Sequence, residues 1–293
     1  MYYWGKILDI HNIPKIKGYH EILNNIDFEL INNSDLSRTN PIPVYTGGGK
    51  IAYIHDNEEY NFFKSEDKYN IIYSIKELNN DELMDCLLLV IEKDAHIAYI
   101  QNLSNYEKCV NDNRKINGSD LLNVGISFIK YMKNKYKLKK IRLKDTSNKI
   151  CKVGQKFELS RFYTLLFGHT WYGIRGFRPF CINLNPKSNL NKEYENNLIK
   201  NKNIRIKDIP KLKSYLLDFY ENCNNSDKIK YETIITSYLQ IIKNNPNENL
   251  GKFLRNLMLD YKNNCAILFS FYKKIYKDAN YADFYMCNFE LNI

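Results

Sequence analysis

Residues 171–179 read Trp171-Tyr172-Gly173-Ile174-Arg175-Gly176-Phe177-Arg178-Pro179, and they predict a helix that turns straight into a strand. Glycine takes the positive φ that a helix C-cap requires, so Gly176 is the expected cap. Pro179 then prevents the helix from restarting. The helix itself is expected over residues 159–171. Tyr172 would therefore lie on the last helical turn, with its hydroxyl facing a cleft.

The residues before this stretch predict two hairpins and a strand–helix–strand unit. Apolar runs on both sides of turn residues indicate hairpins over 41–55 and 86–100. Ser119 is the expected N-cap of a helix over 121–132, whose apolar side chains form one face. Residues 139–144 alternate between apolar and polar and predict the next strand.

The composition changes after residue 186. Residues 187–208 are polar and rich in Asn and Lys, which predicts a linker or a long surface loop. Amphipathic helices are expected beyond it, over 210–223, 230–243 and 250–277 with a break near Asn263, and residues 281–286 as a final strand or helix. The predicted organisation has four parts: 1–80, mixed strands that start the sheet or form their own domain; 81–186, the core; 187–208, a linker; and 209–293, a helical region.

The chain is basic, with 43 Lys and Arg against 33 Asp and Glu and a net charge of +10. A basic surface attracts phosphates in nucleic acids, cofactors or membranes. The alternative is that lysine provides solubility and reflects a codon bias. An excess of Asn, Lys, Ile and Tyr indicates an AT-rich genome, such as that of a parasite or a large DNA virus.

The seven cysteines are scattered and include no CxxC pair, which argues against a disulfide framework and against a zinc site. Reduced thiols in the cytoplasm are therefore expected. The N-terminal residues lack the apolar segment of a signal peptide, and no apolar run approaches the length of a membrane span. We expect a soluble intracellular protein.

The order of these elements resembles the GCN5-related N-acetyltransferase (GNAT) superfamily over about residues 83–183, with 40–80 as the first strands of the sheet. The resemblance implies an α/β fold of the α+β type, in which helices flank a mixed twisted sheet, here with a C-terminal helical extension. In that family a (Q/R)-x-x-G-x-(G/A) turn opens a helix, and its backbone amides hold the pyrophosphate of CoA. Free N–H groups and the helix dipole both favour an anion at such a position.

The corresponding turn would be formed here by Arg114, Lys115, Asn117, Gly118 and Ser119. The next residue, Asp120, stands where the family has a small residue, and its carboxylate occupies the positive end of the helix. An ordinary helix start is therefore the alternative to a CoA-binding turn.

Tyr172 matches the family pattern Tyr-x-x-x-Gly-Phe, in which the tyrosine often protonates the departing CoA thiolate as a general acid. His169 lies three residues earlier, on the same predicted helix face, and would be the base that deprotonates an amine. Arg175 and Arg178 would contact an acidic substrate or cofactor phosphates. The alternative for each of these side chains is a structural role.

Three functions follow from this sequence. The first is transfer of an acetyl group from acetyl-CoA to an unknown amine. The second is a catalytically inactive GNAT-like structural or interaction protein, for example of a large DNA virus, with a protein partner on the C-terminal helices. The third is nucleic-acid binding, which the Lys and Tyr content favours but no recognition motif supports.

Overall fold

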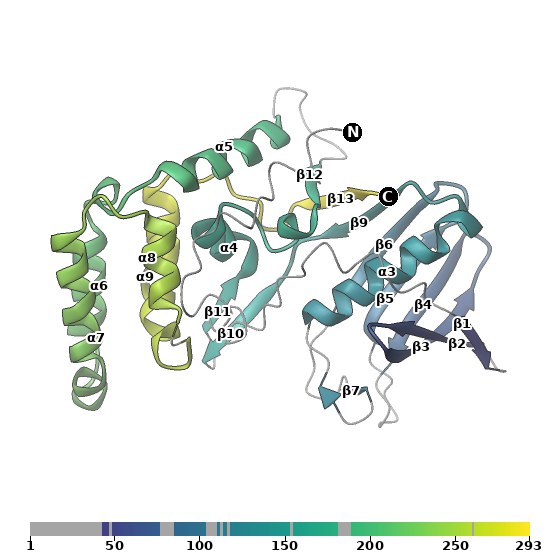
Figure 1. Cartoon of the computed structure of the whole chain (residues 1–293), viewed down its shortest axis with the longest axis horizontal. Helices are drawn as coiled ribbons and strands as arrows, with labels where there is room; N and C mark the ends of the chain where they lie inside the picture. Colours follow the sequence, from purple (N-terminus) through teal and green to yellow (C-terminus); the bar gives the residue numbers. More distant parts are fainter. Residues whose placement is uncertain are drawn as a thin grey trace.

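The computed structural model describes residues 43–46, 49–76, 85–103, 110–111, 114–115, 118–152, 155–180, 189–259 and 261–293. The fold is mixed α/β, with a large mixed sheet flanked by helices (Figure 1). Within these ranges, every helix is too short or too polar to cross a membrane.

The large sheet combines a meander with a parallel pair. Its neighbouring strands are antiparallel except for β6 and β9, which run parallel. The pairings β1–β2 and β5–β6 confirm both predicted hairpins. In spatial order the strands are β1 (Pro43–Thr46), β2 (Lys50–His55), β3 (Glu58–Glu66), β4 (Asn70–Lys76), β5 (Asp85–Glu92), β6 (Ile97–Leu103), β9 (Lys140–Lys144), β13 (Asn288–Asn292) and β12 (Arg178–Phe180).

Helix α3 (Gly118–Tyr136) connects the parallel strands β6 and β9, as the strand–helix–strand prediction requires. It packs on the meander through Phe128, whose ring stacks on Phe62 at 3.9 Å between centroids. The helix begins at Gly118, so Ser119 lies inside it and the prediction that Ser119 is the N-cap was wrong.

The helices after β12 return the chain to the sheet. They are α5 (Leu190–Asn203), η4 (Ile206–Asp208), α6 (Leu212–Glu221), α7 (Asn225–Asn244), α8 (Leu250–Leu257) and α9 (Tyr261–Asp278). Residues 281–286 form neither strand nor helix, and the final strand is instead β13, which inserts between β9 and β12. Figure 1 shows α6 and α7 at the far end of the molecule from β1 and β2.

Helix α5 replaces the linker that was expected over 187–208, and that prediction was wrong. The helix starts after Asn189, whose side chain accepts a hydrogen bond from the backbone N–H of Lys192. Two of its three buried residues, Asn197 and Asn201, are polar. Asn197 donates to the carbonyl of Ala282 at 2.8 Å and accepts from the same residue's N–H at 2.9 Å. A face that is buried by hydrogen bonding carries no apolar periodicity, so the sequence did not reveal it.

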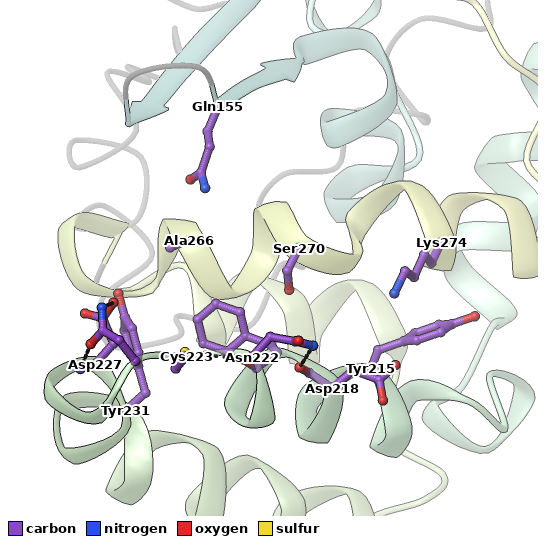
Figure 2. A pocket seen from close by; sticks show the side chains of 12 residues that line it. Gln155, Tyr215, Asp218, Asn222, Cys223, Asp227, Tyr231, Ala266, Ser270 and Lys274 are labelled. Carbon is purple, nitrogen blue, oxygen red and sulfur yellow. Dashed lines mark hydrogen bonds between the residues drawn. The ribbon is translucent and has the colours of Figure 1, made fainter.

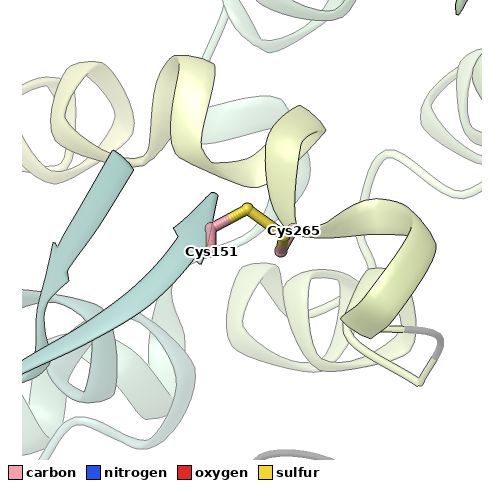
Figure 3. The surroundings of a disulfide bond; sticks show 2 residues. All are labelled: Cys151 and Cys265. Atoms are coloured by element: carbon pink, nitrogen blue, oxygen red, sulfur yellow. A yellow bond between two sulfur atoms is a disulfide. The ribbon is translucent and has the colours of Figure 1, made fainter. Parts of the chain in front are cut away.

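A disulfide joins Cys151, on β10 (Asn148–Lys152), to Cys265 on α9 (Figure 3). Cys86 is also disulfide-bonded, whereas Cys223 and Cys287 are not. The prediction of reduced thiols was therefore wrong. Because the two bonded residues are 114 positions apart, their spacing gave no signal. Disulfides persist in oxidising surroundings, so the cysteines no longer support a cytoplasmic location.

Candidate functional site

Strands β6 and β9 pair in parallel, so their carboxyl ends lie at the same edge of the sheet. Their pairing runs from Ile97 opposite Lys140 to Ile100 opposite Leu143, and β6 then continues to Leu103. At the same level the register between β5 and β6 shifts, which leaves Gln101 as an extra residue. A β-bulge bends the strand that carries it. The parallel pairing ends with Ile100 and Leu143, one residue before β9 itself ends at Lys144.

The N-terminus of α3 belongs to this edge of the sheet, because a helix that links two parallel strands starts where the first strand ends. Within the described part of the chain, a Cβ atom placed on Gly118 would meet no other atom within 4 Å, so there is space beside the first residue of α3. Arg114 and Lys115 form β8, which pairs with β7 (Val110–Asn111) just before the helix. Asn117, the remaining residue of the predicted turn, lies outside the described residues.

The segment after α4 (Leu159–Phe167) forms a second, separate turn. Gly168 ends α4 with φ 79°, so the helix is shorter than the predicted span to residue 171. The 3-10 helix η3 (Gly173–Arg175) follows, and Gly176 ends it with φ 88° and an N–H bond to the carbonyl of Gly173. The positive φ predicted for Gly176 is confirmed, but Tyr172 precedes η3 instead of ending α4.

Tyr172 is buried where this second turn meets the sheet. Its side chain is 6% exposed, and its ring lies beside Trp171, Phe177 and Phe289. It is therefore packed in the core and does not project from a helix surface. Burial raises the pKa of Tyr172 well above its usual range, and the nearby carboxylate of Asp145 raises it further. The hydroxyl thus keeps its proton at neutral pH.

Arg175 links this turn to α3. Its guanidinium donates to the carbonyl of Trp171 at 3.0 Å and to Oδ1 of Asn123 on α3 at 3.4 Å. It also lies over the Trp171 ring, 4.8 Å from the centroid. Burial lowers the pKa of Arg175, and Asp120 in the first turn of α3 acts in the opposite direction. A positive charge is therefore held beside the start of α3.

Asp145 is a site residue that sequence reasoning missed. It follows β9 directly, and its backbone is fixed by two hydrogen bonds of 2.9 Å, one to Cys287 and one from Met286. Ser147 donates to Oδ1 from its hydroxyl at 2.6 Å and from its N–H at 3.1 Å. The side chain is fully buried, and Oδ2 has no hydrogen-bond partner among the residues that the structure describes. Burial raises the pKa of Asp145 to about 6, with a contribution from Asp283.

His169 is placed differently from the prediction. It follows the end of α4, so it does not share a helix face with Tyr172. Its Nδ1 lies 3.0 Å from the hydroxyl of Tyr194 on α5. Burial lowers the pKa of His169 to about 4, and the charges of Arg178 and Lys202 lower it further. His169 is therefore neutral near pH 7 and is joined to α5 by a hydrogen bond.

Neither metal ligands nor known relatives identify the site. The described part of the chain contains no group of three or more His, Cys, Asp or Glu side chains that could hold a metal ion. No protein-family model, curated protein or solved structure matches the chain. The function must therefore be argued from the geometry at the carboxyl ends of β6 and β9.

Asp145→Asn is expected to raise the free energy of unfolding at pH 7.5 by roughly 2–3 kcal/mol. A carboxyl whose pKa rises from 3.8 to about 6 on folding binds its proton more tightly in the native state. Its contribution to stability is complete below the unfolded value and is lost as the pH rises through 6. Asparagine does not ionise, so it places no charge in the buried site as the pH rises. Its Oδ1 can still accept hydrogen bonds from Ser147.

Urea denaturation at pH 3.5 and pH 7.5 measures this effect. The advantage of Asp145→Asn over the wild type should be present at pH 7.5 and absent at pH 3.5. Asp56→Asn, in the exposed turn between β2 and β3, controls for the substitution itself. An equal difference at both pH values would show that the buried carboxylate does not behave as described.

Proposed function

We propose that the chain has a GNAT-like fold and transfers an acetyl group from acetyl-CoA to an amine. One observation carries the proposal. The carboxyl ends of the parallel strands β6 and β9 lie at the edge of the sheet where α3 starts and Asp145 follows β9. Ligands of α/β sheets bind outside the carboxyl ends of parallel strands. The pantetheine arm of CoA would bind at this edge.

The start of α3 fits a pyrophosphate. The first N–H groups of a helix lack intrahelical partners, and the helix dipole adds a partial positive charge. Among the described residues, a Cβ on Gly118 would meet no atom within 4 Å, so there is space beside the first residue of the helix. The turn that would hold the pyrophosphate is made of Arg114, Lys115, Asn117, Gly118 and Ser119.

Tyr172 would act as the general acid of the reaction and Asp145 as the general base. Acetyl-CoA supplies a thioester, whose acyl carbon is attacked by the amine nitrogen as the C–S bond breaks. Tyr172, the tyrosine of the Tyr-x-x-x-Gly-Phe pattern, would give its proton to the departing sulfur. Asp145 has an unpartnered carboxylate oxygen and would accept the proton that the amine loses. This assignment replaces His169, which is bonded to Tyr194, as the base.

Calorimetric titration with acetyl-CoA tests the binding step. We expect a Kd of about 1 μM, which corresponds to roughly −8 kcal/mol. Gly118→Glu should weaken binding at least tenfold, because it adds a negative charge at the first residue of α3. Asn225→Glu is the matched control, since Asn225 is the exposed first residue of α7. A wild-type protein that does not bind acetyl-CoA would rule out the proposed function.

Tyr172→Phe should lower turnover by about 100-fold or more, while acetyl-CoA binding is retained, because only the donated proton is removed. Turnover is followed by release of the CoA thiol with each of a series of primary amines. Tyr73→Phe is the control: this buried tyrosine bonds to Tyr136 at the opposite end of α3. Unchanged turnover in Tyr172→Phe would show that Tyr172 is not the acid.

A catalytically inactive GNAT-like protein is the second candidate. It is favoured by Asp120, which lies in the first turn of α3, where its carboxylate would repel a pyrophosphate. Such a protein would bind partners through its surface and would give no heat with acetyl-CoA. The titration therefore separates the two candidates.

A further inference from the structure

A pocket of about 480 Å³ lies among the helices at the far end of the molecule (Figure 2). It is formed by α6, the start of α7 and α9, with Gln155 of β11 (Gln155–Glu158) also at its wall. Figure 2 shows Ser270 and Lys274 on α9 facing Tyr215 and Asp218 on α6. None of these residues belongs to the site at β6 and β9.

The lining of the pocket is rich in hydrogen-bond acceptors. It carries the carboxylates of Asp218 and Asp227 against one ammonium, that of Lys274. This negative balance is opposite to the net charge of +10 of the whole chain, so it does not follow from the composition. Within the described residues, the Asp218 carboxylate makes no hydrogen bond or ion pair.

Two further polar atoms at the pocket lack partners within the described residues. The side chain of Tyr231 is 1% exposed, and its hydroxyl makes no hydrogen bond there. The buried Oε1 of Gln155 makes none either. A buried polar atom without a partner costs free energy, which a ligand with a matching group would recover. The Gln155 oxygen can only accept a hydrogen bond, and the Tyr231 hydroxyl can accept one as well as donate one.

The cation already present in the pocket lies at its Tyr215 end. The Lys274 ammonium lies over the ring of Tyr215, 5.1 Å from its centroid. The hydroxyl of Tyr215 donates to Asp278 at 2.6 Å. Phe219 offers an apolar ring in the same wall as Asp218.

We propose that this pocket binds a small organic cation with a primary ammonium group on a short alkyl chain. An ammonium has three donors and no acceptor, which matches Asp218, Asp227 and the two unpartnered oxygen atoms. The charge-assisted bonds to the carboxylates orient the ammonium, and Phe219 contacts the alkyl chain. The site is separate from the proposed acetyl transfer and does not depend on it.

Binding of 1,5-diaminopentane tests the proposal, with 1,5-pentanediol as a neutral control of the same length. Calorimetry should give a Kd of about 1 mM or tighter for the diamine, within the limit for a ligand of this size, and no heat for the diol. Cys223 lines the pocket and is not in a disulfide, so it reports occupancy. The diamine should slow alkylation of Cys223 at least fivefold and leave that of Cys287 unchanged.

Asp218→Asn should weaken diamine binding at least tenfold, because it removes the carboxylate that has no other partner. Glu232→Gln, at an exposed position of α7 away from the pocket lining, is the matched control and should bind like the wild type. The proposal is overturned if the diamine does not bind, if the diol protects Cys223 equally, or if Asp218→Asn binds as tightly as the wild type.

Discussion

Replacing Cys151 and Cys265 together by alanine is expected to lower the free energy of unfolding by about 4 kcal/mol. The disulfide closes a loop of 114 residues, and a cross-link over such a loop restricts the unfolded chain strongly. It also ties the hairpin of β10 and β11 to α9, and α9 in turn contacts α6 and α8. Urea denaturation of the oxidised wild type and the double variant measures the difference.

Matched cysteine substitutions separate the disulfide from the loss of a thiol. Cys223→Ala and Cys287→Ala remove half-buried cysteines that are not in disulfides, and each should cost about 1 kcal/mol or less. A reducing agent is a poorer probe, because it would also act on the disulfide of Cys86. If the double variant is as stable as these controls, the cross-link does not stabilise the fold.

Gly173→Ala is expected to lower the free energy of unfolding by about 3 kcal/mol, the upper part of the usual range for overpacking. Its Cβ would lie 1.7 Å from the hydroxyl oxygen of Tyr194 and 2.9 Å from Oγ1 of Thr170. Tyr194 cannot move aside easily, because it is 1% exposed and its hydroxyl bonds to His169. The substitution should therefore push α5 away from the turn that carries Tyr172.

Gly118→Ala is the control, because a Cβ at Gly118 meets no described atom within 4 Å outside its chain neighbours. Its stability should be equal to that of the wild type or slightly higher, since alanine favours a helix more than glycine does. Thermal unfolding followed by circular dichroism compares the two variants. Equal melting temperatures for Gly173→Ala and Gly118→Ala would contradict the packing described for Tyr194.

The candidate site was only partly readable from the sequence. Gly176 was recognisable because a glycine that precedes an apolar residue and a proline marks the end of a helix, and this signal lies within a few residues. Asp145 could have been considered, since it directly follows an alternating strand, and ligands gather at the carboxyl ends of parallel strands. Its importance nevertheless depends on burial by β13, which comes more than a hundred residues later in the chain. Tyr194 on α5, the hydrogen-bond partner of His169, could not be identified from the sequence either, because it also lies on a later element of the chain.

Local sequence determined the two hairpins, the helix of the parallel unit and the turn at Gly176, because alternation, helical periodicity and turn residues act over a few positions. Tertiary structure alone decided the helix at 190–203, the insertion of β13 between β9 and β12, the Cys151–Cys265 bond and the buried carboxylate of Asp145. Each of these depends on a partner far away in the chain. Such partners are chosen by packing and hydrogen bonding in the folded molecule, which no local pattern records.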